Sequence, residues 1–72
     1  MGHDLTKKEA EVLGLMAQGL SNEAIADIMG IKQQSVESYC LVIYDKLMVD
    51  ENTMADRRRY AVLWWQKEQE GL

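Results

Sequence analysis

Five side chains with base-reading chemistry fall on one side of a helix that we predict between residues 33 and 47. They are two glutamines, a glutamate, a serine and a leucine, namely Gln33, Gln34, Glu37, Ser38 and Leu41. Glutamine pairs bidentately with adenine, glutamate accepts from the amino group of cytosine, serine reads several base edges, and an apolar side chain contacts the thymine methyl group. The set is therefore suited to contact with DNA bases. The alternative is that these side chains are simply solvated.

The opposite side of the same segment predicts that these residues face outward. Val36, Cys40, Ile43 and Leu47 recur at i, i+4, i+7 and i+11, which is one narrow stripe of an α-helix. Such a stripe packs against a core. The polar side then points to solvent or to a partner.

A shorter helix is predicted immediately before it, over residues 21–29. Ser21 stands where a helix N-cap belongs, and Gly30 can take the left-handed conformation that ends a helix sharply. Two helices joined by a tight turn match the DNA-binding helix-turn-helix, in which the second helix enters the major groove. Many small helical bundles share this geometry, so the turn alone is a weak signal.

Two further helices complete the expected fold. Thr6 and Glu9 have the spacing of a capping box, which predicts a first helix over about 6–18. Residues 48–56 show no period and are expected to be loop, and a last helix is expected over about 57–69. We therefore predict an all-α, four-helix fold in one domain that spans residues 1–72.

The last predicted helix carries more apolar surface than one face of a terminal helix needs. Its candidate interface residues are Tyr60, Ala61, Trp64 and Trp65. Large aromatic side chains bury much area at low entropic cost, which suits self-association. The alternative is that one tryptophan covers the open end of the core.

Composition narrows the function classes. The 72 residues carry a net charge of −4, which excludes indiscriminate coating of nucleic acid, and no apolar run approaches the roughly 20 residues of a membrane span. The lone cysteine, Cys40, lies on the core stripe, the lone histidine, His3, lies near the N-terminus, and no metal-ligand spacing or phosphate loop is present. We expect a cytoplasmic protein that is not an enzyme and holds no cofactor or metal.

At this point several motifs, spread over most of the chain, resemble those of the LuxR/FixJ/GerE-type DNA-binding domain. They are Leu5-Thr6-x-x-Glu9-x-Glu11-Val12-Leu13, Gly19-Leu20-Ser21-Asn22-x-x-Ile25-Ala26, Gly30-Ile31-x-x-x-Ser35-Val36, Ile43-x-x-Lys46-Leu47 and Ala61-Val62. The resemblance implies four helices, a recognition helix at 33–47, and dimerisation through the last helix. It also implies a stand-alone domain, because no receiver or sensing domain precedes it in this sequence.

The departures from the family pattern concentrate where such domains touch DNA. Glu23 and Glu37 stand where the family usually has basic residues, Lys32 stands where a serine usually caps the recognition helix, and Met48 replaces the usual glycine after Lys-Leu. Residues 21–47 hold two lysines against four acidic residues, a net charge of −2. The candidate phosphate contacts that remain are Lys32, Lys46, Arg57, Arg58 and Arg59.

Two functions follow from these patterns. The first is a sequence-specific transcriptional regulator that binds double-stranded DNA as a homodimer. The second is a degenerate domain of the same type that regulates transcription through protein contacts, by pairing with another LuxR-type regulator or by binding RNA polymerase. The unbroken helix-turn-helix pattern favours the first, and the reversed charges favour the second.

Overall fold

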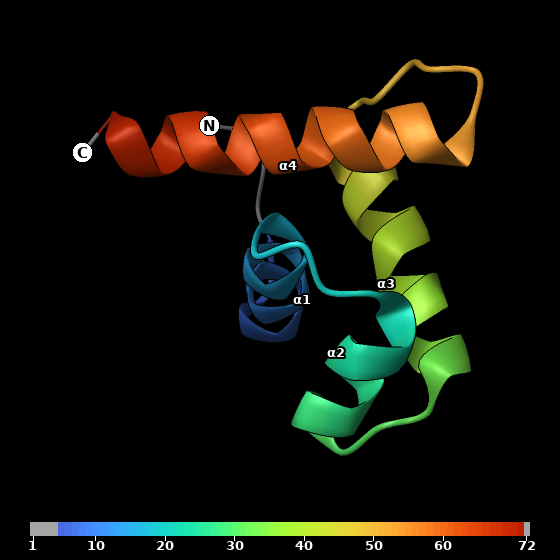
Figure 1. Cartoon of the computed structure of the whole chain (residues 1–72). Coiled ribbons are helices and arrows are strands. Elements are labelled where there is room, and N and C mark those ends of the chain that lie inside the picture. Colours follow the sequence, from blue (N-terminus) through green and yellow to red (C-terminus); the bar gives the residue numbers. More distant parts are fainter. Residues whose placement is uncertain (1–4, 72) are drawn as a thin grey trace.

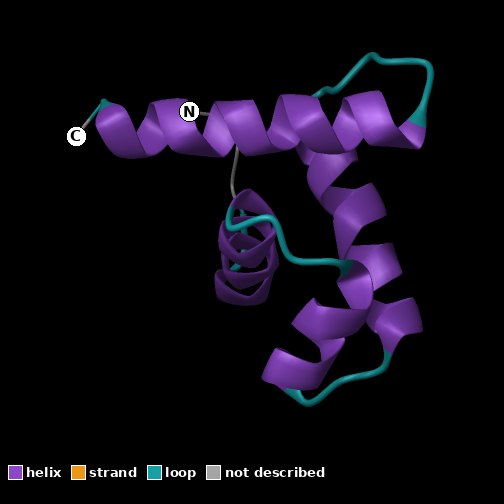
Figure 2. Cartoon of the chain, viewed as in Figure 1, coloured by secondary structure: helices purple, strands orange, loops and turns teal. Residues whose placement is uncertain are grey.

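The computed structural model describes residues 5–71, which form four α-helices and, within that range, no strand. They are α1 (Lys7–Ala17), α2 (Asn22–Met29), α3 (Gln33–Lys46) and α4 (Met54–Glu70) (Figures 1 and 2). The predicted all-α, four-helix fold is confirmed. His3 lies outside the described residues.

The helices surround one core to which all four contribute. Figure 1 shows α4 crossing over one end of the molecule, while α2 and the start of α3 lie at the other end. α1 packs against each of the other three helices, and α3 packs against both α2 and α4. The largest fully buried side chains come from α1, α2 and α3, and are Val12, Leu13, Ile25, Val36 and Ile43.

Side-chain caps start three of the four helices. In α1 the predicted capping box is present, because Thr6 Oγ1 accepts from the Glu9 amide while Glu9 Oε1 accepts from the Thr6 amide at 2.9 Å. In α2 the Ser21 hydroxyl accepts from the Ala24 amide at 3.2 Å. Lys32 precedes α3 and provides no side-chain cap. α3 therefore begins without the stabilisation that a capping serine gives.

The ends of α2 and α3 use the same backbone motif with different residues. After α2, Gly30 is left-handed with φ at 69°, and the Ile31 amide donates to the Ala26 carbonyl oxygen. After α3, Met48 takes the left-handed position with φ at 57°, and the Val49 amide donates to the Tyr44 carbonyl oxygen. Glycine adopts this conformation without steric cost, whereas methionine does not. The end of α3 is therefore strained.

The start of α4 corrects the sequence prediction. Residues 48–56 were expected to be loop and the helix to begin at about 57, but α4 begins at Met54. The Thr53 hydroxyl accepts from the Asp56 amide at 3.1 Å and caps the helix. A threonine followed three residues later by an acid is a helix-start signal, and it outweighs the lack of an apolar period in this segment.

Candidate nucleic-acid interface

The outward face of α3 is placed as its sequence pattern predicts. The four polar side chains of the candidate base-reading set (Gln33, Gln34, Glu37 and Ser38) are exposed, and Leu41 is 52% exposed. Val36, Cys40, Ile43 and Leu47 are buried on the other side. Nothing within the described residues covers the outward face, so it is available to a partner.

One hydrogen bond orders the start of this face. Gln33 Nε2 donates to Glu37 Oε2 at 3.3 Å, one helical turn further on. The bond leaves the Gln33 amide oxygen and the second Glu37 oxygen as acceptors. Acceptors match the amino groups of adenine and cytosine in the major groove and do not match guanine, which offers acceptors there.

The five candidate phosphate-binding residues fall into two groups. Lys32 and Arg59 are exposed, and Arg57 is half-buried with its Nε atom donating to the Glu51 carbonyl oxygen at 2.9 Å. Lys46 and Arg58 are engaged inside the fold. Lys46 Nζ lies 2.7 Å from Glu9 Oε1, whereas Arg58 donates to the Asn22 side chain and the Leu20 carbonyl oxygen. The charged groups of Lys46 and Arg58 are thus both directed to partners within the fold.

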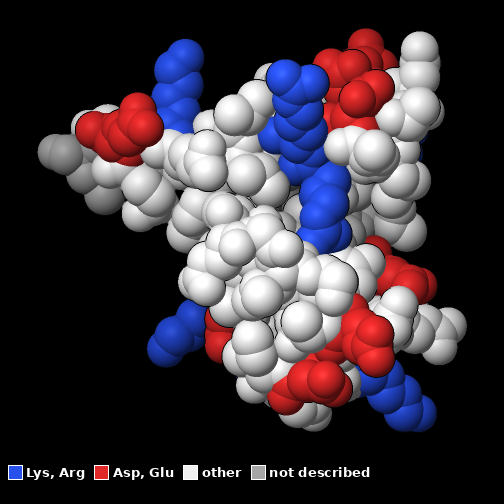
Figure 3. All heavy atoms as spheres, viewed as in Figure 1, with Lys and Arg blue, Asp and Glu red and all other residues white. Residues whose placement is uncertain are grey.

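Acidic and basic side chains both occur at each end of the face that Figure 3 shows, with acidic ones predominating where α2 meets α3. The exposed acids of the helix-turn-helix are Glu23, Asp27, Glu37 and Asp45, of which Asp45 lies in the last turn of α3. Approach of a phosphate backbone to the end where α2 meets α3 requires the carboxylates there to point away from it.

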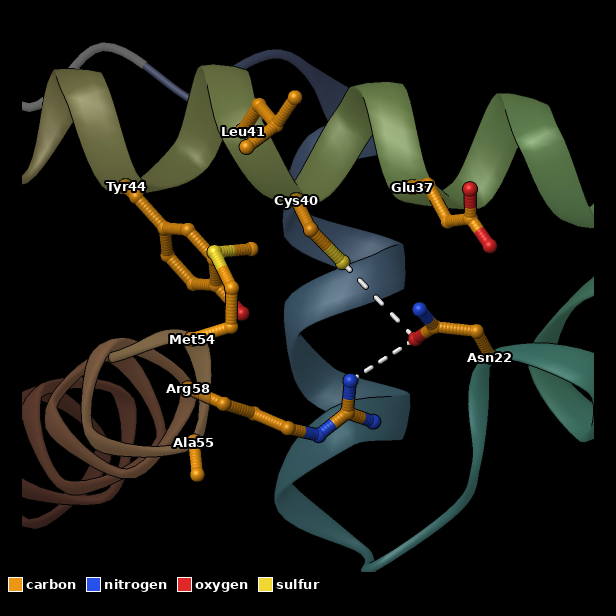
Figure 4. A pocket seen from close by; sticks show the side chains of 8 residues that line it. All are labelled: Asn22, Glu37, Cys40, Leu41, Tyr44, Met54, Ala55 and Arg58. Carbon is orange, nitrogen blue, oxygen red and sulfur yellow. Dashed lines mark hydrogen bonds between the residues drawn. The ribbon is translucent and has the colours of Figure 1, made fainter.

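A hollow of about 420 Å³ lies between the start of α2, the middle of α3 and the start of α4. Leu41, Tyr44 and Met54 line its apolar part, and Asn22, Glu37 and Arg58 line its polar part (Figure 4). The Arg58 side chain reaches from α4 toward Asn22 across this space. Sequence reasoning missed the hollow because its walls come from three helices.

Two buried groups that line the hollow, the Cys40 thiol and the Tyr44 hydroxyl, have raised pKa values. Burial raises the pKa of the Cys40 thiol, with Arg58 nearby acting in the opposite direction. Burial also raises the pKa of Tyr44 to about 12. The thiolate, the reactive form of cysteine, is therefore disfavoured at Cys40. No group of three or more potential metal ligands occurs among residues 5–71.

The candidate interface on α4 is only partly exposed. Tyr60 is exposed, Trp64 and Trp65 are half-buried against the core, and Ala61 is 0% exposed. Ala61 is therefore a core residue of the protomer, and the dimer interface on α4 stays a prediction.

Leu63 was missed by sequence reasoning and is 54% exposed. It lies one turn after Tyr60 and next to Trp64, and these three residues form an apolar stripe that lines a shallow pocket with Lys67. The signal was present in the i, i+3, i+4 spacing of Tyr60, Leu63 and Trp64. Trp65 points elsewhere, because its ring lies against Gly14 of α1, where a Cβ atom would be 3.5 Å from Cζ2.

Comparison with known proteins agrees with this fold. Residues 3–57 match the model of the family described as bacterial regulatory proteins, luxR family. The match covers more than half of the chain. The protein therefore belongs to the luxR family of bacterial regulatory proteins, a class of regulators and not of enzymes.

Three relatives illustrate the similarity. The chain is 46% identical over 46 residues to a probable transcriptional regulator, ycf29, of Guillardia theta, a match that covers 64% of this chain and 22% of the relative. It is 38% identical over 53 residues to the transcriptional regulatory protein DegU of Brevibacillus brevis, a match that covers 74% of this chain and 22% of that relative. It is 37% identical over 51 residues to the DNA-binding transcriptional activator DevR/DosR of Mycobacterium tuberculosis, a match that covers 71% of this chain and 24% of that relative.

These matches span less than a quarter of the length of each of the three relatives. The predictions of a stand-alone domain and of a single domain over residues 1–72 therefore stay predictions. No solved structure matched the chain. No helix in the described part is long and apolar enough to cross a bilayer.

Proposed function

We propose that this protein is a transcriptional regulator that binds double-stranded DNA sequence-specifically as a homodimer, with α3 in the major groove. The observation that carries the proposal is the uncovered outward face of α3, where Gln33, Gln34, Glu37, Ser38 and Leu41 are exposed on a helix anchored by a buried apolar stripe. The relative in Mycobacterium tuberculosis is named as DNA-binding, which supports the same reading.

Phosphate contact in this proposal comes from Lys32, at the turn of the helix-turn-helix, and from Arg57 and Arg59, near the start of α4. Arg57 is kept because its bond to the Glu51 carbonyl oxygen is exposed. We leave Lys46 and Arg58 out, since each would first have to give up a part-buried partner. With few cations and four exposed acids, we expect weak affinity for random duplex and a large share of the affinity to come from base contacts.

Dimerisation in this proposal uses the apolar stripe of α4 formed by Tyr60, Leu63 and Trp64. An aromatic stripe of this kind on an otherwise polar terminal helix is the sort of surface that a second protomer buries. A two-fold dimer would place two copies of α3 on successive major grooves and double the phosphate contacts. The predicted operator is therefore an inverted repeat.

Selection from a random duplex library, followed by titration of the selected sequence at several salt concentrations, tests the proposal. We expect one enriched inverted repeat and affinity that falls as salt rises, by a slope of about 0.9 per phosphate contact. Gln34→Ala should weaken binding, whereas Gln69→Ala, the same change at an exposed position of α4, should not. A folded protein that binds no duplex at low salt would exclude this function.

The reversed charges support a second candidate, in which the domain acts through protein contacts with weak or no DNA binding. Glu23, Asp27, Glu37 and Asp45 give the helix-turn-helix an exposed acidic surface. In this case a pull-down from the native host recovers RNA polymerase or another LuxR-type regulator. Recovery of another regulator should be lost in Leu63→Asp, which changes the exposed stripe of α4 and leaves the Trp65 ring on Gly14. Recovery that survives this change would exclude pairing through that stripe.

A further inference from the structure

The Arg58 side chain links α4 to the start of α2. No Cα atom of α2 lies within 8 Å of a Cα atom of α4. Arg58 nevertheless reaches from the second turn of α4 to the Leu20 carbonyl oxygen, at 2.5 Å from Nη2, and to Asn22 Oδ1, at 2.8 Å from Nη1. These acceptors stand on either side of Ser21, the N-cap of α2.

The same contact extends to α3. Asn22 Oδ1 also lies 4.0 Å from Cys40 Sγ, a weak contact that joins the middle of α3 to the same group of atoms (Figure 4). Tyr44 of α3 lines the same hollow as Arg58. Arg58 is thus bonded to Asn22 of α2, and Asn22 in turn lies beside Cys40 of α3.

The link crosses an open space. The space around the Arg58 side chain is the hollow of about 420 Å³, so the first turns of α4 are separated from α2 and part of α3 by an open space that one side chain crosses. Charge-assisted hydrogen bonds from the two arms of one guanidinium fix direction as well as distance. Loss of such a link leaves the facing helices freer to move relative to one another.

We infer that Arg58 is a positioning residue, which sets the helix-turn-helix against α4 and thereby supports DNA binding through geometry and not through contact with phosphate. This inference rests on the proposed function, because α4 is the helix through which the dimer is proposed to form. A dimer presents two copies of α3 at a fixed separation only if each α3 is held firmly relative to α4. Both terminal nitrogens of the Arg58 guanidinium already donate to acceptors within the fold.

The test compares Arg58→Met, Arg58→Lys and Arg59→Met with the wild-type protein on the selected operator. Arg59→Met is the matched control, because it removes the same charge from the neighbouring, exposed side chain. If Arg58 positions the helix-turn-helix, Arg58→Met weakens binding about tenfold, because the loss of its two charge-assisted bonds lowers the population of the binding-competent arrangement. The salt slope stays at its wild-type value. Arg58→Lys gives little rescue, because an ammonium lacks the planar fork.

Two results on DNA would overturn the inference. If Arg58 binds phosphate, Arg58→Met lowers the salt slope by about 0.9 and Arg58→Lys restores most of the affinity. The control Arg59→Met is expected to lower the slope by the same amount, because Arg59 is a proposed phosphate contact. If Arg58 only stabilises the fold, the variant melts at a lower temperature, but its folded form binds as tightly as the wild type does.

Amide hydrogen exchange supplies a readout that needs no DNA. We expect faster exchange in Arg58→Met at residues 20–24 and along α3, and wild-type exchange there in Arg59→Met. Unchanged exchange in Arg58→Met would overturn the positioning role. If the wild-type protein binds no duplex, the proposed function is overturned, and the dependence of DNA affinity on Arg58 falls with it. The exchange data would still decide whether the link holds α2 to α4.

Discussion

The Nζ atom of Lys46 lies 2.7 Å from the Oε1 atom of Glu9, so the last turn of α3 is joined to the first turn of α1 by a partly buried ion pair. The same Glu9 oxygen accepts from the Thr6 amide in the capping box of α1. One carboxylate thus starts α1 and fixes the end of the helix that we propose reads DNA. Lys46→Met should therefore destabilise the fold and not merely remove a surface charge.

We expect Lys46→Met to lower the free energy of unfolding by about 2 kcal/mol, because it leaves a buried carboxylate with one fewer partner. Urea denaturation followed by circular dichroism measures the change. Lys8→Met is the control, since Lys8 is an exposed lysine on α1, and we expect it to cost less than about 0.5 kcal/mol. Equal effects of the two substitutions would show that the ion pair contributes nothing measurable.

The stability of the protein should fall in acid because of Glu9. The Lys46 hydrogen bond, followed by the Thr6 backbone bond, lowers the pKa of Glu9 in the folded state from its ordinary value of 4.5. Since the unfolded state binds the proton more tightly, the contribution is fully present above pH 4.5 and is lost as the pH falls through the lower folded pKa. Unfolding measured across this range should give a steeper acid decline for the wild type than for Glu9→Gln. Parallel curves would contradict this assignment.

Met48→Gly should stabilise the protein. Met48 is 80% exposed and has φ at 57°, so its side chain contributes little packing while its backbone is strained. We expect a gain of about 1 kcal/mol, because glycine removes the left-handed penalty but makes the unfolded chain more flexible. Met48→Ala is the matched control, since alanine removes the same exposed side chain and keeps the penalty. A gain in both variants would trace the effect to the side chain and not to the backbone.

Much of this architecture was predictable because local periodicity determines it. The i, i+4, i+7, i+11 recurrence from Val36 to Leu47 requires one side of α3 to be buried, and that places Gln34 and Ser38 outside. The capping box of Thr6 and the left-handed Gly30 are also local features with a sequence signature. The start of α4 had such a signature in Thr53, but the polar, aperiodic residues around it hid the signal.

The remaining features of the site depend on long-range contacts. Glu9 and Lys46 are 37 positions apart, and Asn22 and Arg58 are 36 apart, so no periodicity relates them. Sequence reasoning treated Lys46 and Arg58 as surface cations, because a sequence shows which side chains are charged but not the direction in which each side chain points. Only the packing of α3 and α4 shows that both are already used within the fold.

Glu37→Gln should strengthen binding to duplex of any sequence and weaken discrimination at one base pair. Glu37 is an exposed acid on the outward face of α3, where its charge repels phosphate and one oxygen is available to accept from cytosine. We expect about fivefold tighter binding to random duplex at low salt, as one unfavourable charge is removed. Competition titrations with single base-pair variants of the selected operator measure both effects. Unchanged affinity for random duplex would mean that Glu37 lies outside the interface.

Substitutions at Leu63 and Trp65 should distinguish loss of the dimer from loss of protomer stability. Leu63→Asp places a charge in the exposed stripe beside Tyr60, so we expect a monomer by sedimentation with nearly unchanged stability of the protomer. Trp65→Ala removes a ring that packs on Gly14, and we expect it to cost about 2 kcal/mol of protomer stability. Gln69→Asp is the control, because Gln69 is exposed on the opposite side of α4 from Tyr60 and the added charge should leave the dimer intact. If Leu63→Asp remains dimeric while Gln69→Asp dissociates, the dimer forms through the face of α4 that carries Gln69. The spacing of the two operator half-sites then has to be predicted from a dimer built on that face.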